Sequence, residues 1–326
     1  MPDKPVLITG INGFVASHLA ERLLREGQPV RGLARRPETA SWIAAQGAEI
    51  VAGDLLDPSG LAAAVDGCGA VVHAAAWTGG PELPPESAWH TNVTATQHLA
   101  DACGVARARF IFISSVAVYG LNPAPIIDET ADTPPVGQLY PDTKIAAEAA
   151  VRRCAAPWVI VRLACTYGPR GTAWTVGPIE RIKAGQLVLL GEDTGLANTG
   201  YIDNVVDGLL LALSHPAAIG EAFNILDGTA VTYRRFYCAY ARMLGREPLP
   251  QVPAWLAGAA SLPPASLARR LMGRPSVGPW SLHFRRNPSL FSIDKAAHVL
   301  GFRPEIGFEE GMCRTEAWLR EAGHLG

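Results

Sequence analysis

Apolar residues in the first half of the chain form short continuous runs that are separated by amphipathic helical patterns. The runs occupy residues 5–10, 29–36, 48–54, 70–76, 109–120 and 157–168. Helical patterns occupy residues 17–27, between the first two runs, and 140–153, between the last two. Continuous apolar runs that alternate with helices are typical of a parallel sheet with helices on both faces. The pattern predicts an α/β fold with a Rossmann-type doubly wound parallel sheet.

This alternation is lost after residue 168, where loops with glycine and proline begin. Later in the chain, a helical pattern at residues 201–213 and an apolar strand pattern at 222–227 return to the sheet. Two more helical patterns follow at residues 234–244 and 307–323. We predict a Rossmann domain made of residues 1–170 and about 201–226. The remaining residues, about 171–200 and 227–326, would form a smaller C-terminal substrate-binding region.

Composition and charge narrow the range of partners. The 326 residues are 48% hydrophobic, which is ample for a core, and the formal net charge of −2 gives no positive field for nucleic acid. The six cysteines show no CxxC pair, which fits a reducing compartment. No targeting pattern is visible, and no run reaches the roughly 18 apolar residues of a membrane span. We expect a cytoplasmic protein that acts on a small molecule.

The first apolar run leads into Gly10, Gly13 and Ala16 and then directly into a helix. Glycine at the first two places allows a tight turn and a close approach to a pyrophosphate, and a small third residue allows close helix packing. The N-terminus of the helix supplies N–H groups and the positive end of its dipole. We predict a dinucleotide site formed by two segments. The turn after the first run would contribute Gly10, Gly13, Phe14 and Val15, and the end of the fourth run would contribute Ala74 and Ala75.

The end of the second apolar run indicates which dinucleotide binds. NAD sites usually carry an acidic residue there, whereas this chain has Arg35 and Arg36, and guanidinium groups pair well with phosphate. NADP(H) is therefore favoured and NAD(H) is the alternative, in which the two arginines are simply solvated. Asp54 and Leu55 are placed to meet the adenine, unless Asp54 only forms a turn.

Tyr140 and Lys144 lie four positions apart on a predicted helix, so they share one face. Reduction of a ketone by a nicotinamide needs a proton donor, and a nearby ammonium lowers the tyrosine pKa from about 10 toward the working pH. A hydroxyl to hold the carbonyl oxygen is available at the end of a strand from Ser115, with Ser114 in reserve. The alternatives are a solvated pair on a helix surface and a serine that caps its strand.

His73 lies in a buried apolar run and is expected to be a hydrogen-bonded core histidine. No other histidine or cysteine stands near it at the spacing of metal ligands, so we predict no metal.

Ordered motifs run along most of the chain. They are TGINGFVA, GDLLDP, HAAA, NVTATQHLADAC, ISSVAVYG, YPDTK, RLACTYGPR, YIDNVVD, FNILDG and DKAAHVLGFRPEIGFEEG. In these motifs the chain resembles the extended short-chain dehydrogenase/reductase family. The resemblance implies that Tyr140 is the general acid/base, Lys144 its partner and a ribose ligand, and Ser115 the hydroxyl that orients the carbonyl. Extended members often dimerise through two helices, here around residues 92–102 and 140–153, so a homodimer is expected.

Two features bear on the substrate. Sugar-nucleotide members usually carry an arginine that clamps the diphosphate, and this chain has Thr199 at that place and Asp203 at the place of a nearby histidine. The residue pattern YIDNV is more similar to that of the branch with 3β-hydroxysteroid dehydrogenases and related ketone reductases. Residues 255–273 fit an apolar substrate wall or a plain packing helix. Leu163, where the family usually has proline, is a departure from the pattern.

These features favour an NAD(P)-dependent oxidoreductase that interconverts a ketone and a secondary alcohol on a mostly apolar molecule, such as a sterol or an aryl ketone. The alternative is a sugar-nucleotide epimerase or dehydratase with tightly bound NAD. A dinucleotide sensor without chemistry is disfavoured, because the chain keeps Tyr140 and Lys144.

Overall fold

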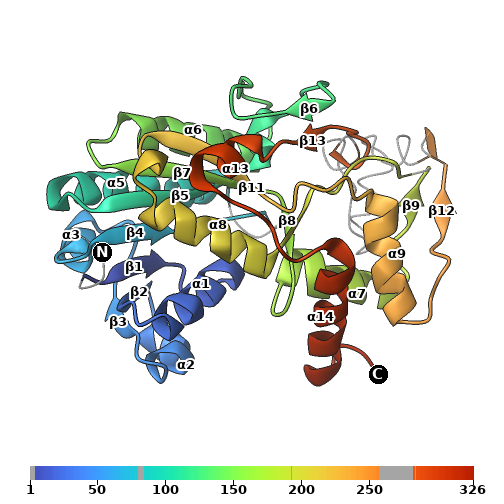
Figure 1. Ribbon diagram of the computed structural model, residues 1–326, viewed down its shortest axis with the longest axis horizontal. Helices are drawn as coiled ribbons and strands as arrows, with labels where there is room; N and C mark the ends of the chain where they lie inside the picture. The colour runs from blue at the N-terminus through green and yellow to red at the C-terminus, as the bar shows by residue number, and fades with distance from the viewer. Residues whose placement is uncertain (1–3, 80–83, 192, 254, 257–281, 283) are drawn as a thin grey trace.

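A parallel sheet of seven strands forms the centre of the computed structural model (Figure 1), which describes residues 4–79, 84–191, 193–253, 255, 256, 282 and 284–326. The strand order is β11-β7-β5-β4-β1-β2-β3. The bounds are β1 (Val6–Thr9), β2 (Val30–Ala34), β3 (Glu49–Ala52), β4 (Ala70–His73), β5 (Arg109–Ser115), β7 (Trp158–Leu163) and β11 (Glu221–Ile225). The order changes direction between β1 and β4, and ligands bind at the carboxyl ends of strands at such a point. The predicted fold class is confirmed.

Helices cover both faces of this sheet, which explains why the strands are apolar throughout. One face carries α1 (Phe14–Arg25), α2 (Ser41–Ala44) and α8 (Ile202–Ser214); the other carries α3 (Pro58–Val65), α5 (Ala95–Ala106) and α6 (Leu139–Arg153). Side chains alternate between the faces along each strand. In β1, Val6 and Ile8 therefore pack into the core under α1, whereas Leu7 packs into the core under α5.

Helix α1 shows how the sequence sets a boundary and a buried face. It begins at Phe14, three residues before the predicted start, because Gly13 has extended backbone and serves as the N-cap. Its buried residues Ala16, Leu19, Ala20 and Leu23 recur at three- or four-residue spacing and face the sheet.

In the part of the chain that the structure describes, three two-stranded parallel sheets accompany the central one. They pair β8 (Cys165–Tyr167) with β10 (Thr199–Tyr201), β9 (Leu189–Leu190) with β12 (Gln251–Val252), and β6 (Ile126–Ile127) with β13 (Leu290–Phe291). The other α-helices among the described residues are α4 (Pro85–Trp89), α7 (Gly177–Lys183), α9 (Tyr233–Met243), α13 (Asp294–Leu300) and α14 (Phe308–Glu321). Shorter helical turns are η1 (Pro37–Ala40), η2 (His90–Thr94), η3 (Val116–Tyr119), η4 (Thr172–Val176) and η5 (Pro216–Ala218).

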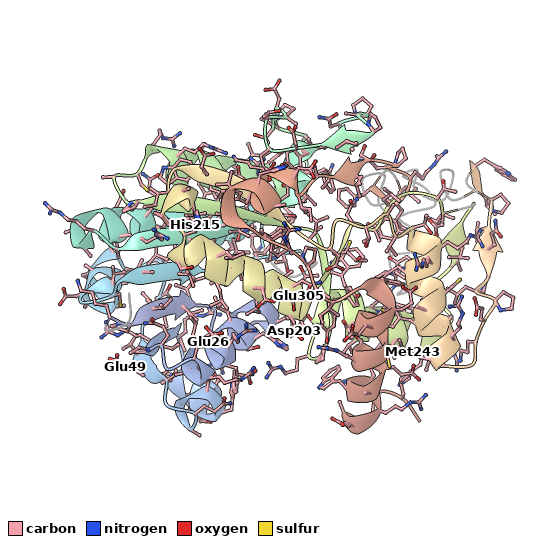
Figure 2. All side chains as sticks on the ribbon, viewed as in Figure 1. Glu26, Glu49, Asp203, His215, Met243 and Glu305 are labelled. Carbon is pink, nitrogen blue, oxygen red and sulfur yellow. The ribbon has the colours of Figure 1, made fainter. Side chains whose placement is uncertain are left out.

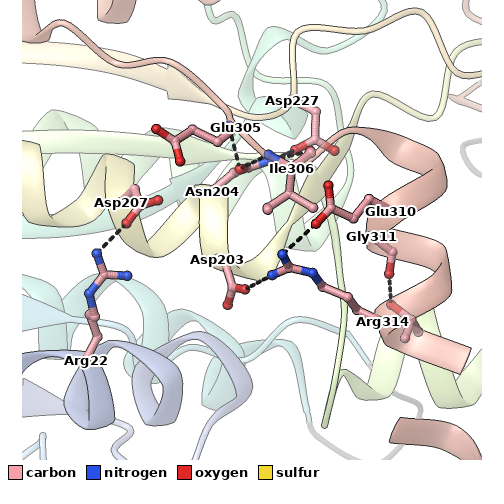
Figure 3. A network of polar contacts seen from close by, with 11 residues as sticks. Arg22, Asp203, Asn204, Asp207, Asp227, Glu305, Ile306, Glu310, Gly311 and Arg314 are labelled. Carbon is pink, nitrogen blue, oxygen red and sulfur yellow. Dashed lines mark hydrogen bonds and ion pairs between the residues drawn. The ribbon is translucent and has the colours of Figure 1, made fainter. Parts of the chain in front are cut away.

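Polar contacts fasten the C-terminal segment to α8. Asn204 Nδ2 donates to the Ile306 carbonyl oxygen at 2.9 Å, and Arg314 lies 3.3 Å from the Asp203 carboxylate (Figure 3). The side chains of Glu26 and Glu305 are exposed at the surface (Figure 2). The C-terminal segment is thus joined to the Rossmann sheet through α8.

The predicted apolar wall and the expected absence of a membrane span can be compared with the described residues. Apart from Trp255 and Leu256, the apolar stretch predicted at residues 255–273 lies outside the described residues. In the part of the chain that the structure describes, every helix is too short or too polar to cross a membrane.

Candidate active site

A tight turn of glycines joins β1 to α1. Gly10 has φ +65°, and a Cβ at this position would lie 2.8 Å from the Ala75 Cα, so the turn needs glycine. The Gly13 N–H donates to the Gly10 carbonyl oxygen at 2.7 Å, which closes the turn. The first N–H groups of α1, from Phe14 onward, have no partner within the helix. A turn of this shape before a helix N-terminus fits the pyrophosphate of a dinucleotide.

A pocket of about 430 Å³ adjoins this turn. It is lined by Asn12, Gly13, Phe14, Ser17, Trp42, Arg170 and Thr172. Arg170 holds Glu21 through two hydrogen bonds of 2.6 and 2.7 Å, and its guanidinium lies 5.7 Å from the centre of the Trp42 ring. The glycine turn therefore adjoins a pocket whose lining includes an aromatic ring, Trp42, and a guanidinium, Arg170.

Arg35 and Arg36 follow directly after β2, and both are exposed. Within the described ranges, neither guanidinium belongs to an ion pair. Asp54, after β3, accepts a hydrogen bond from the Leu56 N–H at 2.9 Å. This bond forms a local turn, which was the alternative to an adenine contact for Asp54. Leu55 is half-buried and packs against the core under α5.

His73 is buried at the end of β4, and both of its ring nitrogens have partners. Nδ1 lies 2.7 Å from Thr9 Oγ1, and Nε2 lies 3.0 Å from Thr96 Oγ1. Burial, assisted by the Lys144 ammonium, lowers the histidine pKa to about 3. The imidazole is therefore neutral and structural, as the sequence predicted. Among the described residues, no group of three or more His, Cys, Asp or Glu could hold a metal ion.

The structure brings Ser115, Tyr140 and Lys144 together at the carboxyl end of β5. Ser115 is the last residue of β5; its Oγ accepts from the Ala117 N–H at 3.2 Å, and its hydroxyl is close enough to the Tyr140 phenol, in the first turn of α6, to affect the pKa of that phenol. Burial raises the Tyr140 pKa, and the hydrogen bond with Ser115 acts in the opposite direction. Two hydroxyl groups thus meet at one point beside the strand end.

Lys144 lies one turn further along α6 and is almost fully buried. Its Nζ donates to the Ile113 carbonyl oxygen at 2.8 Å and lies 4.7 Å from the centre of the Phe112 ring. Burial lowers the Lys144 pKa to about 8, and the nearby Glu148 carboxylate partly offsets that effect. Lys144 thus places a buried ammonium on the helix of Tyr140, one turn further along.

Ser114, the reserve choice for the orienting hydroxyl, faces away from this point. Its Oγ donates to the Glu148 Oε1 at 2.6 Å, on the side of β5 opposite to Ser115. The strand alternation therefore separates the two serines into one that meets Tyr140 and one that meets Glu148.

Asn92, for which the sequence suggested no catalytic or binding role, joins the loop after β4 to α6, the helix of Tyr140 and Lys144. Its Nδ2 donates to Thr143 Oγ1 and to the Trp77 carbonyl oxygen, both at 2.9 Å, and its Oδ1 accepts from the Trp77 N–H at 2.7 Å. It lies in the π-helical turn η2, a feature that is frequent at functional sites. A buried amide within an otherwise apolar helical face is the signal that could have indicated it.

Thr199 and Asp203, the two positions compared with sugar-nucleotide members, are parts of the junction with the C-terminal segment. Thr199 is fully buried in β10, and its carbonyl oxygen accepts from the Asp227 N–H at 2.8 Å. Asp203 is half-buried and pairs with Arg314 (Figure 3). Leu163 is buried at the end of β7, where it pairs with Ile225 of β11.

Comparison with known proteins identifies the family. Residues 6–225 match the family model of the NAD dependent epimerase/dehydratase family. The chain belongs to this family. The predicted membership of the extended short-chain dehydrogenase/reductases is confirmed, and with it the prediction of an NAD-dependent enzyme.

Curated proteins similar to this chain include enzymes named for ketone and steroid substrates. A 4-hydroxy-2-methyl-3-oxo-4-farnesyl-3,4-dihydroquinoline-1-oxide ketoreductase of Stigmatella aurantiaca is 28% identical over 330 residues, covering 98% of this chain and 96% of that protein. A 3 beta-hydroxysteroid dehydrogenase/Delta 5→4-isomerase of Mycobacterium tuberculosis is 29% identical over 325 residues, covering 92% of this chain and 86% of that protein.

Solved structures are also similar to the chain along almost its whole length. The crystal structure of gox2253 aligns with a TM-score of 0.80 at 29% identity, covering 99% of this chain and all of that one. MoeE5 in complex with UDP-glucose and NAD aligns with a TM-score of 0.75 at 25% identity, covering 98% and 99% of the two chains. The family is therefore established, and the proteins similar to this chain include a named ketoreductase and a structure solved with UDP-glucose and NAD.

Proposed function

We propose that the protein interconverts a ketone and a secondary alcohol on a mostly apolar small molecule, with NADP(H) as its cofactor. The observation that carries this proposal is the meeting of Ser115, Tyr140 and Lys144 at the end of β5. The names of the Stigmatella ketoreductase and the mycobacterial steroid dehydrogenase support a ketone or sterol-like substrate.

The chain's own residues would do the proton chemistry. Ser115 and Tyr140 offer their hydroxyl groups to the substrate oxygen from neighbouring positions. Tyr140 gives its phenolic proton to that oxygen during reduction and takes it back during oxidation. The buried Lys144 ammonium stabilises the phenolate left on Tyr140 and would also hold the nicotinamide ribose. The bound dinucleotide supplies or accepts the hydride.

The dinucleotide would lie across the turn of Gly10 and Gly13. This turn has the close approach to Ala75 that leaves no room for a side chain, so it fits a backbone cradle for phosphate. Arg35 and Arg36 would bind the 2′-phosphate of NADP(H), because β2 ends without a carboxylate and both guanidinium groups are exposed. Phe14, Val15, Ala74, Asp54 and Leu55 are the remaining proposed contacts.

A sugar-nucleotide epimerase or dehydratase is the second candidate. The similarity to MoeE5, solved with UDP-glucose and NAD, favours it. Such an enzyme takes a hydride from its substrate and returns it, so it would show no net turnover of cofactor. Three expectations accompany either function: the division into a Rossmann domain and a substrate-binding region, a homodimer through α5 and α6, and a cytoplasmic location.

The experiment that tests the proposal follows the loss of NADPH absorbance when the protein is mixed with bulky aryl and steroid ketones. Consumption of NADPH that disappears in Tyr140→Phe supports the assignment. Consumption of NADH in preference to NADPH would correct only the cofactor. Absence of consumption with every ketone, together with conversion of a UDP-sugar by protein that carries bound NAD, would move the assignment to the second candidate.

A further inference from the structure

A buried ion pair lies behind the catalytic residues, and the proton chemistry above does not use it. Glu148 of α6 and Arg162 of β7 have side chains that are 4% and 2% exposed. Arg162 donates from Nε to Glu148 Oε1 at 2.9 Å and from an Nη to Glu148 Oε2 at 2.7 Å. A bidentate pair of this kind fixes both position and orientation.

Arg162 is held on its other side as well. Its second Nη donates to the Tyr119 phenol at 2.8 Å, and that phenol donates to Asn224 Oδ1 at 2.7 Å. Burial raises the Tyr119 pKa to about 12, so the phenol keeps its proton for this bond. Asn224 Nδ2 donates in turn to the Ser292 carbonyl oxygen at 3.1 Å. The ion pair therefore belongs to a hydrogen-bonded chain that runs from α6 through β7 and β11 to the C-terminal segment.

Three consecutive residues of β5 each make a polar contact with α6. The Ile113 carbonyl oxygen accepts from Lys144, the Ser114 hydroxyl donates to Glu148, and the Ser115 hydroxyl lies near the Tyr140 phenol. Two of these contacts involve residues with proposed chemistry. The middle contact, at 2.6 Å, ends on the carboxylate that Arg162 holds in place. The ion pair thus anchors the central point of the interface between β5 and α6.

We propose that Glu148 and Arg162 are positioning residues: their ion pair holds the Ser114 hydroxyl and so sets the separation of β5 and α6 at which Ser115 meets Tyr140 and Lys144 meets the Ile113 carbonyl. This inference rests on the proposed function of Ser115, Tyr140 and Lys144. The pair has a second effect, because Glu148 is the carboxylate one helical turn from the Lys144 ammonium. It therefore influences both the place and the charge of Lys144.

The charged and titratable groups that face Lys144 come from three elements. Glu148 and Tyr140 belong to its own helix, and His73 faces it from β4 with a neutral ring. Behind Glu148 lie Arg162 of β7 and, on the surface, Arg152, whose Nη is 3.5 Å from Glu148 Oε2. Glu148 is the anion among them whose charge favours the protonated form of Lys144.

The chain offers a direct test because it contains only four lysines, Lys4, Lys144, Lys183 and Lys295. Protein labelled with ¹³C and ¹⁵N in lysine alone gives four side-chain signals by NMR, and Lys144→Arg identifies the signal of Lys144. The measurement is the pH titration of that signal in wild type and in Glu148→Gln. We expect the Lys144 midpoint to fall in Glu148→Gln, since the variant keeps the shape of the side chain and removes its charge.

Glu180→Gln is the matched control, because Glu180 lies 3.5 Å from Lys183 in an exposed pair. This control should leave the Lys144 titration unchanged. A folded Glu148→Gln protein whose Lys144 midpoint equals that of wild type would overturn the proposal. The measurement uses no ketone, so it reports on the ion pair even if the proposed reaction is wrong.

Ser114→Ala provides a second variant in case Glu148→Gln does not fold, since removing one charge of a buried pair is strongly destabilising. It deletes the contact between β5 and Glu148 and leaves the ion pair intact. We expect kcat to fall about 10-fold to 100-fold while KM for NADPH stays unchanged, because misplaced catalytic groups slow the chemistry. Ser114→Ala with wild-type kcat would show that the Glu148 anchor does not set the catalytic geometry.

Discussion

Replacement of Lys144 by methionine should stabilise the fold while it abolishes the reaction. Burial lowers the Lys144 pKa from 10.5 to about 8. At about 1.4 kcal/mol per unit, burying the charged form therefore costs about 3 kcal/mol. Lys144→Met removes this cost but loses the hydrogen bond to the Ile113 carbonyl, which contributes about 1 to 2 kcal/mol. The net expectation at pH 7 is a free energy of unfolding that rises by about 1 to 2 kcal/mol.

The free energy of unfolding should depend on pH in a direction that follows from the lowered Lys144 pKa. Between pH 8 and 10.5 the unfolded chain holds a proton on Lys144 that the folded chain has lost, so the free energy of unfolding of the wild type rises with pH in this window. The advantage of Lys144→Met should therefore be full below pH 8 and shrink as the pH rises above it. Urea unfolding at several pH values measures it.

Lys183→Met is the control for that experiment, because Lys183 has a side chain that is 38% exposed and pairs with Glu180 on the surface. Its free energy of unfolding should stay close to that of wild type at every pH. If Lys144→Met is instead less stable than wild type at pH 7, burial of the Lys144 charge does not destabilise the fold by the amount worked out above, and the reasoning fails.

Three other outcomes are expected. Arg35→Ala combined with Arg36→Ala should raise KM for NADPH by roughly 10-fold to 100-fold and leave KM for NADH unchanged, because each guanidinium would bind the 2′-phosphate alone through a charge-assisted bond. Steady-state kinetics measures both constants, and an equal rise of KM for the two cofactors would contradict this. Gly10→Ala should lower the free energy of unfolding by more than about 1 kcal/mol, since φ is +65° and the new Cβ would meet the Ala75 backbone, and denaturant unfolding with wild-type stability would refute it. The rate of ketone reduction should fall as the pH rises above about 8, where Lys144 loses its proton, and a rate that stays level to pH 10 would exclude a role for its charge.

The central sheet could be predicted because its apolar runs are continuous and its helices are amphipathic. The predictions were less accurate where a run continued past the end of a strand. Residues 157–168 read as one strand, but β7 ends at Leu163 and β8 begins at Cys165, where it pairs with β10 instead of joining the central sheet. Likewise, the run that begins at Arg109 leaves β5 at Ser115 and continues as the turn η3. Apolar character alone does not mark these changes of partner.

The candidate site divides in the same way. Tyr140 and Lys144 could be predicted because their spacing on one helix is visible in the sequence. Glu148 and Arg162 could not, because their pairing joins a helix to a strand through a buried contact that no local pattern encodes. The pairing of β6 with β13 was missed for a related reason: each strand has two residues, and they are more than 160 positions apart.

The most direct test of the account is single-turnover kinetics of NADPH oxidation by Tyr140→Phe, compared with wild type, on a ketone that the wild type reduces. The phenyl ring keeps the packing of Tyr140 and removes its proton. The account predicts that the hydride-transfer rate falls by at least about 100-fold while NADPH still binds, since general acid catalysis contributes roughly that factor or more. A rate within a few-fold of wild type would contradict the central claim that the Tyr140 phenol supplies the proton.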